Sequence, residues 1–325
     1  MRDKRGILLI FLTIILVVLT VTLTTVGSAD LNIVDIISEL FEEKNDLVRT
    51  IVFKMRLPRN ILAIIVGANL AVSGLLLQAV MKNSLADPGI TGVSSGASVG
   101  AIIILLVAPQ YTKILPIVAF AGGVVACLLV YIMAWKKGLR PERIVLSGVA
   151  VNAILGGVIS LLSVLYSERI QSAMMWLNGT LSNKSWSDVE MIGGYSVIGL
   201  ILALLMIRKA NILQLGDDVA TNLGINVVKT RAIISAIAVF LAGISTAVVG
   251  IISFVGLIVP HIARMLMGTD HKYTIPFSII LGSIVLLLAD ALGRSIWGGV
   301  EIPVGVIMAI VGGPFFLYLL RKRGM

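Results

Sequence analysis

The stretch AIISAIAVFLAGISTAVVGIISFVGLIVPHIA, Ala232–Ala263, decides the class of this protein, because its 32 residues include no Asp, Glu, Lys or Arg. As one helix it would reach about 48 Å at about 1.5 Å per residue, whereas the hydrocarbon of a bilayer is about 30 Å thick. Residues that interrupt helices also divide it: Gly243, Gly250, Gly256 and Pro260. We therefore expect two membrane-spanning helices that separate near Gly250–Ser253.

Eight further charge-free runs have the length of about 17–25 residues that crosses a bilayer as a helix. They are Ile7–Val26, Ile61–Met81, Pro88–Thr112, Ile114–Trp135, Ile144–Ser167, Met191–Ile207, Tyr273–Ala289 and Ile302–Leu320. Of the 325 residues, 58% are hydrophobic and 13% are charged, against roughly 25% charged in soluble domains. This composition excludes a soluble enzyme and a disordered chain, and the single Cys127 excludes a disulfide scaffold. The predicted fold class is an all-α integral membrane protein with ten transmembrane helices.

The distribution of basic residues supports an even number of crossings. Both ends of the chain are basic, with Arg2, Lys4 and Arg5 at the start and Arg321, Lys322 and Arg323 at the finish. The positive-inside rule places both ends in the cytoplasm. Ten crossings put 17 Lys and Arg inside and 9 outside, with 6 acidic residues inside and 11 outside. The net charge of +9 therefore indicates membrane topology and not a nucleic-acid partner.

The chain is expected to form one transmembrane domain, 1–325, with a first helix at 7–26 and an outer amphipathic segment at 30–50. Helices two to six follow at 61–207, a cytoplasmic loop at 210–229 and helices seven to ten at 232–320. Small residues after the first run, Gly27-Ser28-Ala29, resemble a signal-cleavage site, but the run exceeds the roughly 7–15 residues of a signal core. Glu168–Leu177 is a candidate short outer helix ended by Asn178-Gly179. Gly92, Gly96 and Gly100 form a stripe that favours close helix packing.

Enzyme signatures are missing from the sequence. It has no G-x-x-x-x-G-K-[ST] loop for ATP phosphates, and His261 and His271 lack the spacing of metal ligands. We therefore expect no bound metal and no cofactor. Asp290, Arg294 and Glu301 cluster at one end of two runs, away from the membrane centre where a proton- or sodium-coupled carrier needs carboxylates. A secondary carrier or channel, and a membrane enzyme using Asp290 and Glu301, are the rival interpretations.

A series of short motifs runs from residue 56 to the C-terminus. They are Arg56-Leu57-Pro58-Arg59, Gly67-Ala68-Asn69-Leu70-Ala71-Val72-Ser73-Gly74, Asn83-Ser84-Leu85-Ala86-Asp87-Pro88-Gly89, Leu146-Ser147-Gly148, Trp176-Leu177-Asn178-Gly179, Leu215-Gly216-Asp217-Asp218-Val219-Ala220, Ser253-Phe254-Val255-Gly256-Leu257-Ile258-Val259-Pro260-His261, Glu301-Ile302-Pro303-Val304-Gly305 and Gly312-Gly313-Pro314. By their order and spacing, these motifs together resemble the iron–siderophore, haem and cobalamin family of bacterial ABC importer permeases (FecCD type).

This resemblance implies a type II ABC importer permease architecture in the bacterial cytoplasmic membrane. It implies a second permease subunit, either identical or related, two ATPase subunits on the cytoplasmic side and an extracytoplasmic binding protein. The chain would carry an Fe(III)-siderophore, or alternatively haem or cobalamin, by alternating access. ATP hydrolysis would occur on the partners, so the chain itself would not be an enzyme.

Roles for particular residues follow from the same resemblance. Arg56, Arg59 and Arg294 match arginines that receive acidic residues of the docked binding protein; the alternative is that they snorkel to lipid headgroups. The residues implied to couple to the ATPase are Leu215, Gly216, Asp217, Asp218, Ala220, Leu223 and Gly224, with Gly216, Ala220 and Gly224 at helical spacing as a close-packing surface. Asn83 and Leu85 would belong to the cytoplasmic gate. Met174, Met175 and Trp176 would lie at the outer mouth of the path.

Overall fold

The computed structural model describes residues 2–26, 46–136, 138–296 and 300–323, and these ranges contain helices and no strands. Seven helices are long and apolar enough to span a membrane, and three shorter apolar helices accompany them. These ten helices confirm the predicted fold class. In chain order they are α1 (Arg2–Thr22), α4 (Leu57–Met81), α5 (Val93–Ile102), α6 (Leu115–Ala134), α7 (Pro141–Leu165), α9 (Trp186–Leu205), α12 (Val227–Val249), α13 (Val255–Met267), α14 (His271–Ser295) and α15 (Val304–Arg323).

Short helices join or extend the ten. They are α3 (Asp46–Arg49) and η1 (Thr50–Arg56) before α4, η2 (Pro88–Thr91), η3 (Ile103–Val107), η4 (Pro109–Ile114), η5 (Ser167–Arg169), α8 (Ile170–Leu177), α10 (Ile207–Gln214) and α11 (Asp217–Asn222). The helix α8 ends at Leu177, before Gly179 with φ +63°, as the sequence predicted. Of the outer amphipathic segment predicted at 30–50, residues 30–45 lie outside the described residues.

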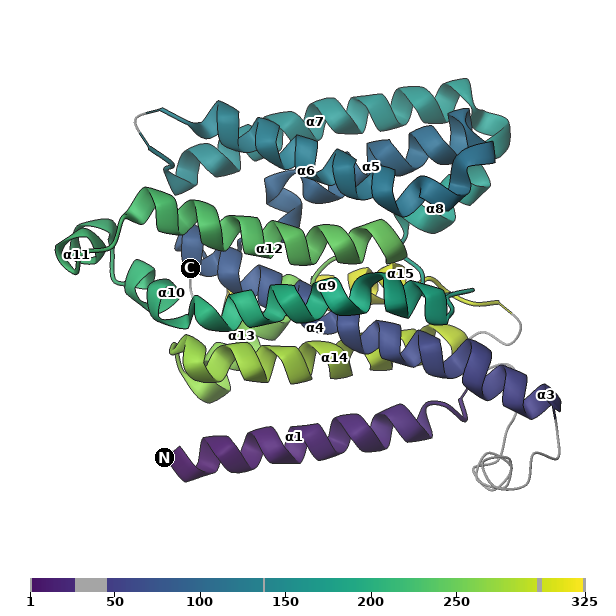
Figure 1. The fold of residues 1–325 in the computed structure, drawn as a ribbon, viewed down its shortest axis with the longest axis horizontal. Coiled ribbons are helices and arrows are strands. Elements are labelled where there is room, and N and C mark those ends of the chain that lie inside the picture. Colours follow the sequence, from purple (N-terminus) through teal and green to yellow (C-terminus); the bar gives the residue numbers. More distant parts are fainter. Residues whose placement is uncertain (1, 27–45, 137, 297–299, 324–325) are drawn as a thin grey trace.

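The helix α4 lies at the centre of the bundle and packs against α14, α12, α13 and α9 (Figure 1). Its glycines permit this packing. A Cβ atom on Gly67 would lie 2.2 Å from the carbonyl oxygen of Gly282 on α14, and one on Gly74 would lie 2.0 Å from that of Gly256 on α13. The backbones are therefore in direct contact, and any side chain at these positions would separate the helices.

A second group of helices, α5, α6 and α7, packs on the side of the bundle opposite α1 (Figure 1). The predicted glycine stripe is at its centre, since a Cβ atom on Gly96 would lie 2.2 Å from the carbonyl oxygen of Gly122 on α6. By contrast, α1 contacts α14 and otherwise lies on the outside of the bundle, with its apolar side chains exposed.

The predicted division of Ala232–Ala263 is confirmed. The helix α12 ends at Val249, Gly250 takes φ +80°, and α13 begins at Val255. Pro260 lies inside α13 and does not cause the break. The irregular segment meets two others at a backbone junction formed by Gly179, Gly250 and Gly305: Thr180 N–H donates to the Val249 carbonyl (2.8 Å) and Gly305 N–H donates to the Gly179 carbonyl (3.1 Å).

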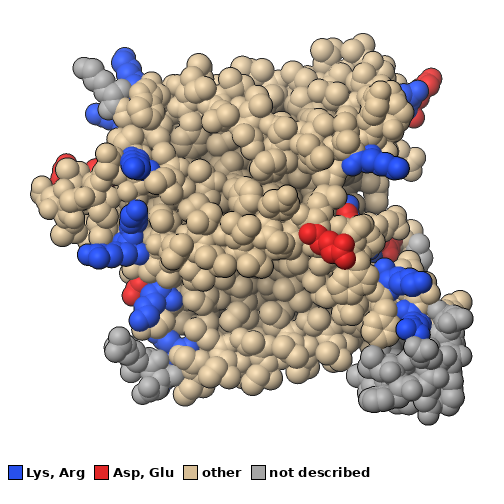
Figure 2. Space-filling view, in the orientation of Figure 1, with Lys and Arg blue, Asp and Glu red and all other residues tan. Residues whose placement is uncertain are grey.

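Charged side chains gather at the two ends of the bundle, and a broad central band on the face shown carries none (Figure 2). One end, the α11 end, holds α10, α11 and both chain ends (Figure 1). The other, the α8 end, holds α3 and α8. An apolar band between two charged ends is the pattern of a protein that spans a bilayer.

Candidate functional sites

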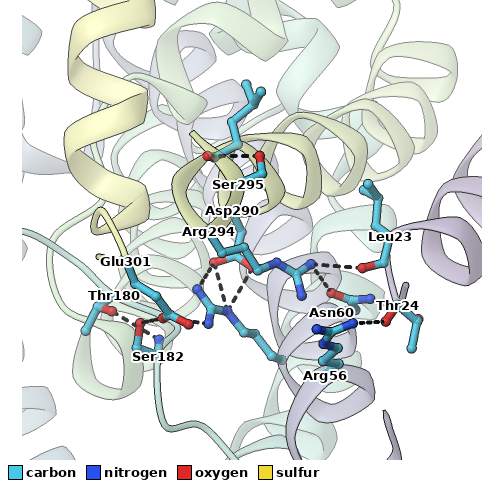
Figure 3. Close-up of polar contacts among 12 residues, drawn as sticks. Leu23, Thr24, Arg56, Asn60, Thr180, Ser182, Asp290, Arg294, Ser295 and Glu301 are labelled. Carbon is cyan, nitrogen blue, oxygen red and sulfur yellow. Dashed lines mark hydrogen bonds and ion pairs between the residues drawn. The ribbon is translucent and has the colours of Figure 1, made fainter. Parts of the chain in front are cut away.

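At the α8 end, Arg59 in the first turn of α4 is buried and fully engaged. Its Nε and Nη2 donate to the Asp290 carboxylate on α14 (2.9 Å each), and its Nη1 donates to Glu301 (2.8 Å). Ser182 also hydrogen bonds to Glu301 (Figure 3). A bidentate arginine–carboxylate pair fixes both geometry and distance. Arg59 therefore joins α4, α14 and the segment before α15.

Arg56 and Arg294, the other two arginines predicted for docking, join the end of α1 to this cluster. Arg56 Nη1 donates to the carbonyls of Thr24 (3.0 Å) and Thr25 (2.7 Å). Arg294 Nη2 donates to the Asn60 side-chain oxygen (2.8 Å), and its Nε lies 3.4 Å from Asp290 (Figure 3). Arg294 is 6% exposed, and its Nη1 has no hydrogen-bond partner among the described residues. Of these three arginines, Arg294 is therefore the one with a buried Nη1 donor that no described residue accepts from.

These arginines line a pocket of about 430 Å³, which we call the charged pocket. Its charged lining residues are Lys54, Arg56, Arg59, Lys184, Arg294 and Glu301. Five cations against one carboxylate give the pocket a positive potential suited to an anionic group. Partial burial opposes ionisation of Glu301, but the Ser182 hydroxyl and Arg59 hold the pKa of this carboxyl below its ordinary value of 4.5. Glu301 therefore stays charged at neutral pH.

The predicted outer-mouth residues divide between the surface and the core. Met174 and Met175 on α8 are exposed. Trp176 is buried in an apolar cluster with Ala97 and Ala247, and its carbonyl packs on Gly250. Trp176 thus holds α8 against the glycine junction, and the two methionines are the ones available to a passing molecule.

At the α11 end, the predicted coupling stretch forms α11 and its two flanks, and Gly216 joins it to α10 at φ +118°. Its exposed side chains include three large apolar ones, Leu215, Val219 and Leu223, beside the polar Asp218, Thr221 and Asn222. Ala220 is fully buried, so the predicted small-residue surface of Gly216, Ala220 and Gly224 is not open at its centre. The correction has a simple geometric reason: residues at i and i+4 share a helix face, and the sequence did not reveal that the leucine face points outward.

Asp217, the first residue of α11, accepts hydrogen bonds from Lys82 and from Arg231 of α12. Partial burial disfavours its charge, yet these two donors hold the pKa of its carboxyl below the ordinary value of 3.8. The sequence reading did not single out Lys82 or Arg231. Lys82 immediately precedes Asn83 and Leu85, the predicted gate residues, and both of these are exposed at the end of α4. The Asn83 side chain accepts from Leu85 N–H (2.8 Å) and shapes this turn.

No group of three or more His, Cys, Asp or Glu side chains that could hold a metal ion lies within the described ranges. What the chain offers is two charged ends, each built from several helices, joined by a glycine-packed apolar bundle. These features define a multi-pass membrane protein.

Comparison with known proteins gives the family. The model of the FecCD transport family matches residues 12–322, and the chain belongs to that family. It is 40% identical over 324 residues to the Fe(3+)-citrate import system permease YfmD of Bacillus subtilis strain 168, covering 99% of this chain and 96% of the relative. It is 38% identical over 319 residues to the haem-iron transport system permease IsdF of Staphylococcus aureus strain MW2, covering 98% and 97%.

The fold is also shared with solved structures. A metal-chelate type ABC transporter in an inward-facing conformation superposes with a TM-score of 0.88 and 27% identity, over 98% of this chain and 99% of that one. The complex PsaBC of Streptococcus pneumoniae shows the same fold at a TM-score of 0.60 and 19% identity, over 89% and 95%. The chain is therefore a bacterial multi-pass ABC transporter permease, a transport component.

Proposed function

We propose that this chain is the membrane-spanning subunit of an ATP-driven importer for an Fe(III) chelate of the siderophore class. The observation that supports this most is the match along nearly the whole chain to permeases of iron import systems, one for Fe(3+)-citrate and one for haem iron. Ferric citrate and haem, the cargoes of these two relatives, are both iron held by an organic chelator. Haem and cobalamin are the alternative cargoes of the same transport class.

The subunit would work with a second permease copy or a related chain, two ATPase subunits at the α11 end and a binding protein at the α8 end. Both chain ends would lie in the cytoplasm, as the basic residues at the two termini favour. The exposed apolar residues of α11 offer the ATPase a surface that excludes water when covered. ATP binding and hydrolysis on the partners would shift α11 and alternate the access of the path between the two ends.

The charged pocket is proposed as the docking site for acidic side chains of the binding protein. Its lining carries Lys54, Lys184 and Arg294 beside the engaged Arg59, and Lys184 lies 3.6 Å from Asp188. A partner carboxylate in the pocket would meet this surplus of cations and form charge-assisted hydrogen bonds. The protein contacts of the three arginines favour this role over snorkelling to headgroups.

A secondary carrier remains the rival function. It would need a carboxylate near the membrane centre. In the described residues, the carboxylates of the spanning helices lie near helix ends, as Asp290 does in the last two turns of α14. We therefore favour energy input from partner ATPases.

Uptake measurements test the proposal. Cells with and without this gene would be offered radiolabelled iron as ferric siderophores, ferric citrate or haem, and labelled cobalamin in parallel, and the series would be repeated with the partner ATPase deleted and after ATP depletion. We expect uptake of one iron chelate to be lost in each case. Uptake that persists in ATP-depleted cells would support the carrier, and loss of cobalamin uptake alone would exclude an iron cargo.

A further inference from the structure

Arg231 in α12 is the most deeply buried large cation in the described chain, at 1% exposure. Its guanidinium reaches three segments that lie far apart in sequence. Nε donates to the Val80 carbonyl in the last turn of α4 (3.2 Å), Nη1 donates to the Leu139 carbonyl before α7 (2.6 Å), and Nη2 donates to the Asp217 carboxylate (3.0 Å). A buried charge is tolerated when its donors are satisfied in this way.

Lys82 binds the same carboxylate from the other side. It ends α4 in the left-handed conformation (φ 47°), and its Nζ donates to Asp217 Oδ1, the oxygen that Arg231 also contacts. Asn83 and Leu85 follow directly in the chain. The Asp217 carboxylate therefore links the first turn of α11 to the turn after α4 through Lys82 and to α12 through Arg231, by one charge-assisted contact each.

The exposed apolar residues at α11, Val219 in the helix and Leu215 and Leu223 at its two ends, take no part in this link. The Asp217 side chain is 47% exposed and contacts Lys82 and Arg231. A partner that moves α11 through its apolar face would thus move a carboxylate held by two other segments. Rigid contacts of this kind transmit displacement between sites.

We propose that Arg231, with Lys82 and Asp217, is a positioning cluster that couples the movement of α11 to the turn at residues 82–87. Arg231 binds no cargo and no nucleotide; it fixes the end of α4, the residue 139 segment and α11 as one body. The inference rests on the proposed function, in which α11 receives the ATPase.

The test uses the assembled importer in proteoliposomes, with cargo uptake and ATP hydrolysis measured together. The variants are Asp217→Asn, Lys82→Met and Arg231→Met, with Asp217→Glu as the conservative variant. Glu142→Gln, an exposed carboxylate in the first turn of α7, is the matched control. We expect Asp217→Asn and Lys82→Met to lower the cargo imported per ATP hydrolysed by about fivefold or more, the lower range of coupling between sites. Asp217→Glu should recover most of the ratio, and the control should keep it.

Two results would overturn the proposal. One is an unchanged ratio of cargo to ATP in Asp217→Asn and Lys82→Met. The other is a parallel loss of uptake and hydrolysis, which leaves the ratio of cargo to ATP unchanged and would show that the cluster stabilises the complex and does not couple it. Because both of these substitutions lie at the partly exposed rim, they test the idea even if Arg231→Met does not fold. Failure of the proposed function would give a different result, because wild-type proteoliposomes would then show no ATP-dependent uptake.

Discussion

Arg59 uses three nitrogens on Asp290 and Glu301, whereas Arg294 leaves Nη1 without a partner in the described part of the chain. Asp290, Arg294 and Glu301 lie between two consecutive predicted spans, so their clustering could be predicted from the sequence. It could not add Arg59 as the principal partner of Asp290, since 231 residues separate the two and only the contact between α4 and α14 brings them together. The role of Arg231 could not be predicted from the sequence either, because its partners lie in other helices and two of them are backbone carbonyls.

Replacing Arg59 should destabilise the permease. Arg59→Gln would leave Asp290, whose side chain is 1% exposed, without its bidentate partner. Removing one member of a buried pair costs about 3–5 kcal/mol, so we expect a clear drop of the unfolding temperature in detergent. The double variant Arg59→Gln with Asp290→Asn should recover part of the loss, because no buried charge is then stranded. Equal melting of Arg59→Gln and wild type would contradict the pairing.

Arg294 and Lys184 should instead control docking. Charge reversal in Arg294→Glu or Lys184→Glu places a carboxylate where the binding protein is proposed to bring its own, and we expect about tenfold weaker affinity, mainly through slower association. The measurement is binding of the purified binding protein to the permease complex in nanodiscs. Lys113→Glu, an exposed cation in η4 outside the charged pocket, is the control. If the control weakens binding as much as the pocket variants, the charged pocket is not the docking site.

Among the elements, α11 forms a helix as predicted, but Ala220, at the centre of the predicted small-residue surface, is buried. The helical spacing of Gly216, Ala220 and Gly224 predicts a helix with a close-packing surface, and the structure has the short helix α11 there. Which face turns outward depends on where α4 and α12 end, and that is set by tertiary packing. By contrast, the break between α12 and α13 was readable, because Gly250 and the excessive length of the run are local properties.

The exposed face of α11 gives an element-scale prediction. Leu223→Asp would put a charge into the apolar surface proposed to contact the ATPase, and we expect about tenfold or more loss of ATPase retained on co-purification, the effect of losing an interface hot spot. Asn222→Asp introduces the same charge at the neighbouring exposed residue, and this control variant should retain far more ATPase than Leu223→Asp. Retention of the ATPase by Leu223→Asp at the wild-type level would remove this face from the interface.

On the scale of the whole molecule, the charge pattern and the structure agree on the number of spans, even though α5 and α13 are shorter than a usual crossing. The length of α13, which has only 13 residues, and the central position of α4 in the bundle could not be predicted from the sequence. Those properties follow from glycine contacts between helices that are remote in the chain.

Orientation is the molecule-scale prediction. Thr112→Cys in η4 at the α8 end should react with a membrane-impermeant maleimide in right-side-out vesicles, whereas Asn222→Cys in α11 should react only after the vesicles are opened. The native Cys127 is 8% exposed and adds little background. The basic ends of the chain motivate this expectation. Labelling of Asn222→Cys in sealed vesicles would reverse the proposed topology.

The short α13 has a consequence for how the chain is made. Its 13 residues reach only about 20 Å, so residues 250–254 must complete the crossing without a helix. Bare backbone in lipid is costly, and here Gly179 and Gly305 cover it, the latter in a helix synthesised afterwards. During biogenesis α13 therefore cannot be released stably into the bilayer as it emerges from the translocon. It must wait for α15, so a helix that is translated later completes the insertion of an earlier one.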